Sequence, residues 1–539
     1  MDKEGTAQAF RNHQAPDVSL VLISTVIALT VYFVINRWWR RERWEKYGVK
    51  HVNVGMYTFP EARNRFLMAR PELTVGFSSD TPVLITRDLD LLKQILVKDF
   101  NNFSNRGTPI PTKSPLGQGL FFLNDSDWKR IRQLMSPSFS TGKLKRISIH
   151  VQDAANRLSE VFQKCAETGT NLKLLHTTGQ YTSSIIAKTA FGVAADSIGQ
   201  EEDDQFTYFV KNIFKKRSKH SPIFLAILLA FPRFRRFLTF TLGLYFPDPI
   251  TSQSTDYFQA ILKETIAERE VAERQGSRHV NNDFLQSLVS TMVASEEKTT
   301  AEDKSEEKKT PISNGSMNCS TSPKKTISTQ EIIAQSVLTI FAAYETTAST
   351  LQFCLYKLAQ NPEVQEKVYE EILAVVEHED PTHEELAKLN YMGQVIDETL
   401  RLFPPLVRIR RQAVEARTYG PITIPAGANV EIPIKEIHRD PSHYPDPEVF
   451  DPDRFSAENK SKRNPLAFIP FGQGPRLCIG MRLAYLELKI ALVQVLRKVK
   501  VELNDTTVPR KGEEITTTYT LIFPRSKEPI ELAVKFRGE

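Results

Sequence analysis

The chain has 539 residues, of which 41% are hydrophobic and 25% charged, a composition ordinary for a globular protein. A formal net charge of +6 is modest for this length, and no nucleic-acid-binding motif accompanies it, so the sequence favours a membrane surface or an acidic partner over nucleic acid. The four cysteines are too widely spaced for a disulfide framework, so we expect the main body of the protein in a reducing compartment.

The first predicted element is a membrane anchor. Residues 18–35 carry no charge, and as a helix they would measure about 27 Å at about 1.5 Å per residue, just enough to cross a bilayer. A cleaved signal peptide and a buried core helix are the alternatives. Residues 37–46 are basic and rich in tryptophan and lack a small-residue cleavage site, which favours an uncleaved anchor whose basic flank faces the cytosol. The predicted boundaries are a lumenal N-terminus at 1–17, an anchor at 18–36 and a juxtamembrane linker at 37–70.

Short strands and helices follow the linker. Residues 74–77 and 82–86 have the composition of strands, and residues 89–97 have a helical pattern. Residues 107–119 contain several prolines and are predicted to form a loop. A further helix is predicted to begin near Asp125.

Trp128 and Arg132 are one turn apart in this helix, so both side chains can reach one anionic group. By itself the pair is a weak signal, because such spacing is more common on an ordinary helix surface. Basic residues also cluster here and in the helical pattern at 144–190, and they offer either a face for an acidic protein partner or a plain solvated surface. They are Lys129, Arg130, Lys143, Lys145 and Arg146.

Two later segments differ in composition from their surroundings. Residues 211–220 are strongly basic and lead into an apolar run at 222–231 that is too short to span a bilayer. The run is either a buried helix or part of a lid, residues 211–236, that dips into the membrane interface. Residues 295–326 are charged, of low complexity and without aromatic residues, so they are predicted to be a disordered insertion.

A long helix is predicted from a capping box at Ser328–Glu331 to a stop near Asn361, which precedes a proline. Glu345 and Thr346 lie near its middle, between apolar stretches. An acid on a helix usually faces solvent. Glu345, however, lies halfway along a helix that is predicted to be buried, and a buried carboxyl group requires a specific structural or functional reason.

The most specific pattern lies at residues 470–480, a glycine-rich loop that leads into a predicted helix at 481–499. Its glycines allow tight turns and close backbone approach. Free amide groups at the start of the helix favour an anion at Cys478, which suits this residue to be a thiolate metal ligand. A lone cysteine beside a helix start is otherwise more often a buried structural residue.

The loop carries the pattern Phe-x-x-Gly-x-Arg-x-Cys-x-Gly and resembles the haem-binding loop of the cytochromes P-450. Its five fixed positions are filled by Phe471, Gly474, Arg476, Cys478 and Gly480. Two further signatures of that family are matched, Glu-x-x-Arg at Glu398 and Arg401, and Pro-Asp-Arg-Phe at residues 452–455. Stretches such as DETLRLFP, HRDP and FGQGPRLCIGMRLA are most similar to the family-3 clan, which includes drug and steroid oxidases and thromboxane synthase. The similarity extends over residues 72–534.

The resemblance implies a haem b group whose iron is held by the Cys478 thiolate. It also implies that Phe471 packs beside the thiolate. Glu345 and Thr346 would relay protons at a local widening of the helix, although Ala343 stands where the family has glycine. The haem propionates would be seated by Arg106, Trp128, Arg132, Arg411 and Arg476. A buried structural network would be formed by Glu398, Arg401 and Arg454.

The implied fold is the cytochrome P-450 fold, mainly α with small β-sheets (α+β), with residues 71–539 as the haem-thiolate catalytic domain. The expected activity is a monooxygenase that inserts one oxygen atom from O2 into a lipophilic xenobiotic, steroid or fatty acid. Electrons would come from NADPH through NADPH–cytochrome P-450 reductase, with cytochrome b5 as a second candidate partner. The expected location is the endoplasmic reticulum membrane, single-pass, with the catalytic domain cytosolic. A reductase-independent haem-thiolate isomerase of a lipid peroxide and a non-catalytic haem sensor are the alternatives.

Overall fold

In the computed structural model, the described residues are 27, 31–32, 44–50, 74–77, 82–107, 115–213, 252–276, 283–306, 326–520 and 523–538. Helices account for most of them. The helices are α3 (Leu89–Lys93), α4 (Asp125–Met135), α5 (Thr141–Thr168), α6 (Leu174–Ile186), α7 (Gln205–Lys211), α10 (Ser252–Arg274), α11 (Phe284–Glu306), α12 (Thr329–Gln360), α13 (Pro362–Val375), α14 (His383–Lys388), α15 (Asn390–Leu402), α16 (Ile434–Ile437), α17 (Ala457–Lys462) and α18 (Met481–Leu496). The strands are β1 (Thr74–Phe77), β2 (Val83–Thr86), β3 (Leu172–Lys173), β4 (Ile409–Gln412), β5 (Arg417–Tyr419), β6 (Ile422–Ile424), β7 (Asn429–Ile432), β8 (Val499–Glu502), β9 (Thr517–Thr520), β10 (Phe523–Ser526) and β11 (Glu531–Phe536).

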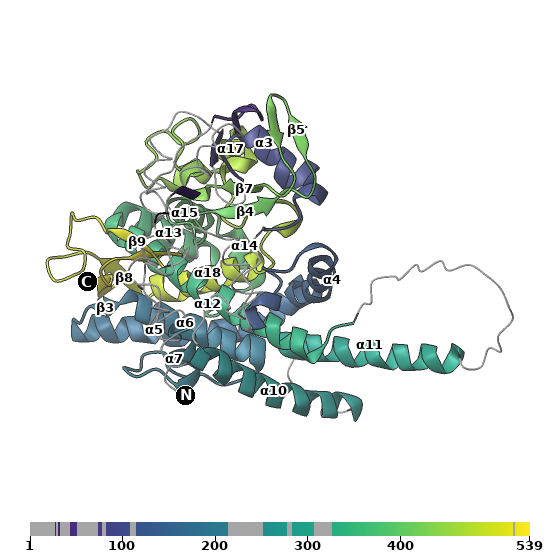
Figure 1. The fold of residues 1–539 in the computed structure, drawn as a ribbon. Coiled ribbons are helices and arrows are strands. Elements are labelled where there is room, and N and C mark those ends of the chain that lie inside the picture. The colour runs from purple at the N-terminus through teal and green to yellow at the C-terminus, as the bar shows by residue number, and fades with distance from the viewer. Residues whose placement is uncertain are drawn as a thin grey trace, which may run out of the picture.

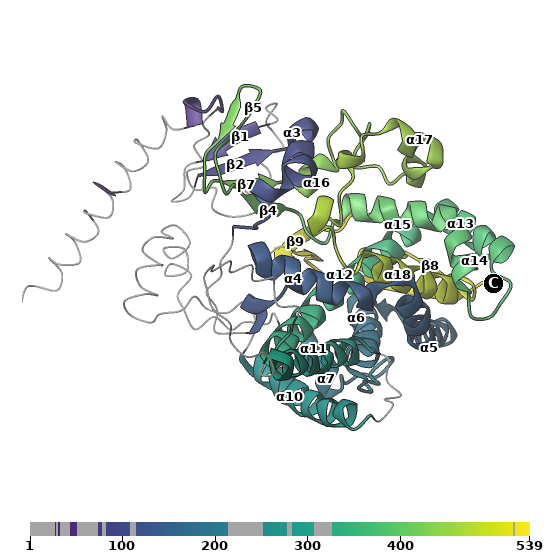
Figure 2. The same cartoon turned by 90° about the vertical axis from the view of Figure 1, so that its right-hand side faces the viewer.

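The strands form small sheets rather than one continuous layer. β1, β2, β7 and β4 make a four-stranded sheet in that order, in which β2 and β7 run parallel and the other neighbours antiparallel. β3, β11 and β8 form an antiparallel sheet, and β5–β6 and β9–β10 are two-stranded. The four-stranded sheet, with α3 beside it, lies at the opposite end of the molecule from α10 and α11 (Figure 1 and Figure 2). β1 and β2 confirm the two predicted strands, with β2 beginning at Val83.

The long helix α12 crosses the middle of the molecule (Figure 2). It begins at the predicted capping box, where the Glu331 amide donates to Ser328 Oγ at 3.3 Å and the Ser328 amide donates to Glu331 Oε2 at 2.9 Å. It ends at Gln360, because the residue before Pro362 disfavours helical geometry. α6, α10, α15 and α18 pack around it and bury most of its side chains. The predicted long helix is confirmed.

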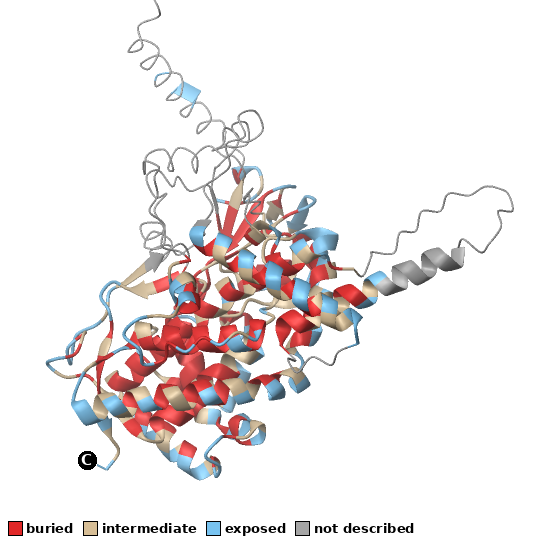
Figure 3. Cartoon of the chain, turned by 90° about the horizontal axis from the view of Figure 1, so that it is seen from below, coloured by how far each residue is buried: buried red, intermediate tan, exposed pale blue. Residues whose placement is uncertain are grey.

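Two large apolar clusters meet along α12. One joins α5, α6, α15 and α18 to the helix from Leu351 onward. The other joins α10 and α11 to the helix up to Tyr344. Buried residues accordingly concentrate in this helical core (Figure 3). The polar stretch at 345–350, which contains the predicted acid and alcohol, therefore lies between the two clusters.

Two predicted helices are shorter in the structure because the chain turns into a strand. The helical pattern at 144–190 divides into α5 and α6, because Gly169 ends α5 in the left-handed region at φ +65° and β3 follows. The helix predicted at 481–499 ends at Leu496, since Val499 begins β8 and pairs with β11. Sheet pairing overrides the local helical pattern at both places.

The predicted disordered insertion at 295–326 differs from the structure in its first part. α11 continues to Glu306, so residues 295–306 are helical. Glutamate, lysine and alanine, which recur in this stretch, are good helix formers, and their charge does not oppose a solvated helix. Residues 307–325 lie outside the described residues.

The predictions about membrane segments fall almost wholly outside the described residues. Of the predicted anchor at 18–36, only residues 27, 31 and 32 are described. The apolar run at 222–231 and most of the predicted lid at 211–236 also lie outside. Across the part of the chain that the structure does describe, no helix is both long and apolar enough to cross a bilayer.

Candidate functional site

The loop before Cys478 is held in a tight shape by its glycines. Gly474 has a φ of +75°, and a Cβ there would lie 1.9 Å from the carbonyl oxygen of Leu96, which belongs to a π-helical turn at Gln94–Lys98. No other residue fits this position without moving the backbone. The Cys478 amide then donates to the Phe471 carbonyl oxygen at 3.0 Å, which closes the loop just before α18 begins.

Opposing influences act on the Cys478 thiol. Its pKa is raised overall, because burial outweighs the backbone hydrogen bonds from Gly480 and Met481 and the positive charges of Arg132 and Arg106, which lower it. The side chain is nevertheless accessible to solvent. An accessible sulfur that receives backbone amides at the start of a helix, within reach of two cations, is suited to bind a metal as a thiolate.

Four guanidinium groups act on one another electrostatically, and two of them, those of Arg106 and Arg132, also act on this sulfur. The four groups belong to Arg106, Arg132, Arg411 and Arg476. Burial and the charge of Arg411 hold the pKa of Arg106 well below its usual value, and burial with mutual repulsion lowers the pKa of Arg411 and of Arg476 to about 9. None of the four forms an ion pair with a carboxylate of a described residue. A buried cluster of like charges of this kind needs an anion.

Several donors of the cluster lack partners, although their side chains are buried. Nε of Arg106, Nε of Arg411, and Nε and Nη1 of Arg476 have no hydrogen-bond partner among the described residues. Two of these guanidinium groups form one hydrogen bond each to a backbone carbonyl oxygen. Arg476 Nη2 donates to Leu123 at 2.7 Å, and Arg411 Nη1 donates to Arg410 at 2.9 Å. Buried donors rarely remain unpaired, so these atoms mark a binding site for carboxylates.

Aromatic rings complete the cationic side of the site. Trp128 is buried on α4, and the Arg476 guanidinium lies 4.4 Å from its ring centroid. The Arg106 guanidinium lies 3.8 Å from the centroid of Phe121. These rings hold two of the arginines in place, so the cations remain fixed without a carboxylate beside them.

The residues present fit a haem group. One thiolate provides a single axial ligand, and the buried arginines with unpaired donors suit the two propionates. Ile479, beside Cys478, packs against the same large apolar cluster as Phe341 and Ala343 of α12, so the residue next to the cysteine belongs to an apolar wall of the core. No group of three or more His, Cys, Asp or Glu side chains suited to a free metal ion occurs among the described residues. The structure thus links Arg106 and Arg132 to the Cys478 thiol, and Arg411, Arg476 and Trp128 to these arginines, while their roles toward a haem stay a prediction.

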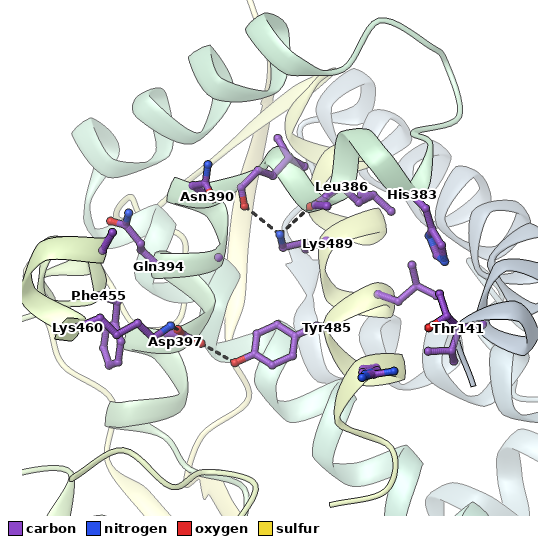
Figure 4. Close-up of a pocket in the computed structure, with 17 residues that line it drawn as sticks. Thr141, His383, Leu386, Asn390, Gln394, Asp397, Phe455, Lys460, Tyr485 and Lys489 are labelled. Atoms are coloured by element: carbon purple, nitrogen blue, oxygen red, sulfur yellow. Dashed lines mark hydrogen bonds and ion pairs between the residues drawn. The ribbon is translucent and has the colours of Figure 1, made fainter. Parts of the chain in front are cut away.

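The helix after Cys478 borders a separate cleft, and Phe471 packs against one of the residues that line it, Tyr485. The Phe471 ring lies 5.5 Å from that of Tyr485 on α18, and the Tyr485 hydroxyl donates to Asp397 of α15. A cleft of about 910 Å³ lies between α14, α15 and α18. Lys489 crosses it and donates to the carbonyl oxygens of Leu386 and Leu389 at 2.7 and 2.9 Å (Figure 4). Cys478 does not line this cleft, so the volume of the cleft is not the volume of the site at the cysteine.

Glu345 and Thr346 differ in their surroundings. Glu345 is 2% exposed and forms a two-point ion pair with Arg525 of β10, Nε–Oε1 and Nη2–Oε2 both at 2.6 Å. Thr346 is half-buried, and its hydroxyl donates to the Ala342 carbonyl oxygen at 2.7 Å. α12 stays a regular α-helix through this turn, so the expected local widening is not present. Ala343 in place of glycine agrees with that regularity.

Glu398, Arg401 and Arg454 lie together in the interior, away from the thiol. Arg401 donates to both Glu398 oxygens, at 2.6 and 2.7 Å, and both side chains are fully buried. Arg454 Nε lies 3.6 Å from Glu398 Oε1. Arg401 also donates to the carbonyl oxygens of His438 and Pro447, so it ties α15 to the loop that precedes Arg454.

The proposed basic face is partly neutralised. Arg130 pairs with Glu331 and donates to the Thr326 carbonyl oxygen, so it fixes the start of α12 instead of facing a partner. Lys145 lies 3.4 Å from Glu384. Lys129 and Arg146 are exposed. These pairings could not be predicted from local residue patterns, because each joins segments far apart in the chain.

Comparisons with known proteins agree with this site. The family model described as Cytochrome P450 matches residues 72–527. The chain is 32% identical to Cytochrome P450 3A56 of Fundulus heteroclitus over 501 residues, which is 90% of this chain and 93% of that protein. It is 35% identical to Cytochrome P450 3A12 of Canis lupus familiaris over 80% of this chain and 79% of that protein. It is 31% identical to Cytochrome P450 6a8 of Drosophila melanogaster over 82% of each chain.

Proposed function

Because the chain belongs to the cytochrome P450 family, whose members bind haem through a cysteine thiolate, we propose that this monooxygenase inserts one oxygen atom from O2 into a lipophilic substrate. The observation that carries the proposal is the accessible Cys478 sulfur beside buried arginines whose donors are unpaired. This arrangement combines one axial ligand with a cationic side and an apolar wall. A xenobiotic, a steroid or a fatty acid would fit the apolar character of that wall.

The roles of the residues follow from their placement. Cys478 holds the iron, and Arg106, Arg132, Arg411 and Arg476 bind the propionates, with Trp128 holding Arg476 in position. When bound, the haem supplies the reductive activation of dioxygen. Phe471 accepts the Cys478 amide at its carbonyl oxygen and packs its ring against Tyr485 of α18, so it fixes the loop that carries the sulfur. The protein keeps the thiolate fixed by backbone donors, so no reorganisation is needed at that atom.

Protons for the reaction are assigned to Glu345 and Thr346. Glu345 is a buried acid in the polar stretch of α12, and the Thr346 hydroxyl is the next side chain. The Thr346 hydroxyl donates to Ala342 and keeps its oxygen lone pairs available to accept a hydrogen bond. The pair thus offers a donor–acceptor step from a buried acid to a half-buried hydroxyl in the middle of the helix.

The electron source and the location are part of the same proposal. Electrons come from NADPH through NADPH–cytochrome P-450 reductase, with cytochrome b5 as a second partner, and the protein is anchored in the endoplasmic reticulum membrane by residues 18–36. The uncharged stretch followed by a basic, tryptophan-rich flank supports the anchor. The exposed cations Lys129 and Arg146 are candidates for contact with an acidic partner.

A substrate screen on the full chain with haem and reductase tests the proposal. Oxygenated product is expected only when reductase and NADPH are both present, with one NADPH consumed for each product in the coupled case. The alternative is an isomerase of lipid peroxides, which would convert a peroxide substrate without reductase or NADPH. Turnover of peroxides alone, with no NADPH-dependent product from any lipophilic compound, would overturn the monooxygenase proposal.

A further inference from the structure

Arg525 and Glu345 form a two-point ion pair. The two residues are far apart in the chain, yet both carboxylate oxygens receive an N–H at 2.6 Å. The carboxylate is 2% exposed, whereas the arginine is 30% exposed. The pair therefore joins a buried acid in α12 to a side chain that still reaches solvent.

The β9–β10 hairpin that carries Arg525 packs directly on this part of α12. The ring centroids of Phe341 and Phe523 lie 6.0 Å apart in an edge-to-face arrangement. Phe523 is buried, so the strand is fixed against the helix two residues before the arginine. Arg525 is consequently held in place by packing and not only by its charge.

Few other charged groups act on Glu345. Tyr344 is its neighbour on α12, and burial with the charges of Glu345 and Asp203 raises the pKa of that phenol well above its usual value, so the phenol stays neutral. Glu487 of α18 forms its hydrogen bond with Thr347, not with Glu345. Arg525 is the cation that the described residues place on the Glu345 carboxylate.

A carboxylate oxygen that accepts one N–H keeps a second lone pair for a proton, but protonation removes the negative charge on which both charge-assisted bonds to the arginine depend. The guanidinium stays charged, since arginine is not deprotonated in proteins. Uptake of a proton by Glu345 therefore weakens both of its bonds to Arg525. Proton uptake and loosening of the ion pair are one event.

We propose that Arg525 is a positioning residue that holds Glu345 ionised and oriented toward β10, and that the passage of protons through Glu345 depends on release of this ion pair. The inference rests on the proposed function for its catalytic consequence, but the state of Glu345 can be measured without turnover. A cation in the C-terminal hairpin then controls an acid in the central helix. No motif in the sequence points to that link.

Infrared difference spectra of the haem-loaded full chain test the state of Glu345. In Arg525→Gln, burial without a cation favours the neutral carboxylic acid at neutral pH, so a new carbonyl band of a protonated acid is expected. Glu487 contributes a band of this kind to every variant, so the expected signal is an additional band in the difference between Arg525→Gln and wild type, absent from the difference between the double variant Arg525→Gln/Glu345→Gln and wild type. Lys527→Gln, which removes an exposed cation from the same hairpin, is the matched control and should show no additional band. Absence of the additional band in Arg525→Gln would overturn the proposal.

Turnover provides the second readout. Product formed per NADPH should fall by about tenfold to 10²-fold in Arg525→Gln, while oxidation driven by an organic hydroperoxide, which does not require proton delivery to dioxygen, should stay within about twofold of wild type. Lys527→Gln should match wild type in both assays. Unchanged coupling in Arg525→Gln would overturn the proposal. If the wild-type protein formed no product by either route, the proposed function would fail, and the infrared band would still decide the role of Arg525.

Arg525→Lys keeps the experiment decisive if Arg525→Gln does not fold. Lysine keeps the positive charge but replaces the two-point contact by a point charge. Glu345 should then remain ionised, with no new band, while coupling still falls because the carboxylate is no longer held in one orientation. Coupling equal to wild type in Arg525→Lys would show that the two-point geometry has no positioning role.

Discussion

The Arg476 guanidinium lies over the indole ring of Trp128, with its central carbon 4.4 Å from the ring centroid. Arg476 is two residues before Cys478, whereas Trp128 belongs to α4. The contact therefore joins the cysteine loop to a helix from the first third of the chain. Because Arg476 also donates to the Leu123 carbonyl oxygen at 2.7 Å, its remaining donors keep a fixed direction.

Removing that contact should weaken haem binding. We expect Trp128→Ala and Arg476→Gln each to raise the rate of haem loss about 10- to 100-fold, the range for residues that hold a metal site from outside its direct ligands. Transfer of haem to an excess of a scavenging apoglobin measures the rate. Arg482→Gln, an exposed cation in the first turn of α18, is the control and should lose haem at the wild-type rate. Equal rates in all proteins would mean that Arg476 does not bind a propionate.

Cys478→His should keep part of the haem but lose the strongly red-shifted absorbance of the reduced carbon-monoxide complex. That absorbance reports a thiolate opposite the gas, and imidazole cannot replace it. The spectrum of the dithionite-reduced protein under carbon monoxide is the measurement. Cys165→Ser removes a half-buried thiol elsewhere and should leave the spectrum unchanged. A wild-type spectrum in Cys478→His would exclude Cys478 as the ligand.

Thr346→Ala should leave haem binding intact and uncouple NADPH consumption from product. The hydroxyl is no metal ligand, but it lies beside the buried Glu345 and is the alcohol of the proton step. Product per NADPH is expected to fall, with hydrogen peroxide released, and 10²-fold is the upper scale because water can substitute in part. Thr350→Ala is a matched control, since its hydroxyl makes the same kind of bond, to the Thr346 carbonyl oxygen at 2.7 Å. Unchanged coupling in Thr346→Ala, with turnover of peroxides alone, would favour an isomerase.

Glu487 should make the protein less stable as the pH rises. Burial raises its pKa to about 8, a hydrogen bond to Thr347 opposes this, and Oε2 has no partner among the described residues. An unfolded glutamate has a pKa of about 4.3, so between these values the folded state holds a proton that the unfolded state has lost. Unfolding then releases a proton, and the free energy of unfolding falls by about 1.4 kcal/mol for each pH unit in that window.

The variant Glu487→Gln removes this titration. Its urea midpoint should vary less than that of wild type between about pH 5 and pH 8, and at pH 8 it should be more stable by a few kcal/mol, on the order set by that slope. Glu528→Gln, an exposed acid, should follow the wild-type curve. The prediction fails if Glu487→Gln keeps the wild-type dependence on pH.

Features that depend on neighbouring residues were predictable from the sequence. The capping box at Ser328, the stop before Pro362 and the two strands that begin the four-stranded sheet all follow from local residue choice. The haem loop was predictable because its pattern is specific, and two of the expected arginines, Arg106 and Arg132, act on the Cys478 thiol in the structure.

Long-range pairings could not be predicted. Nothing near Arg525 indicates that it meets Glu345, and nothing near Glu331 indicates that it meets Arg130. The parallel pairing of β2 with β7 joins residues more than 300 positions apart, and one sequence contains no signal for it. The helix at residues 295–306 was not predicted, because the charged, low-complexity composition favours disorder although the same residues have a good helix propensity.

The unpaired guanidinium groups also link the amount of this protein to the supply of its prosthetic group. Arg106, Arg411 and Arg476 repel one another, so the folded state gains more than an ordinary site does from binding a dianion. A ligand that binds only the folded state stabilises it by RT ln(1 + [L]/Kd), about 2.7 kcal/mol at a hundredfold excess over Kd. Chains made faster than haem is supplied would spend more time unfolded and be removed by proteases. The steady-state level of the enzyme would then follow haem synthesis even at a constant rate of translation.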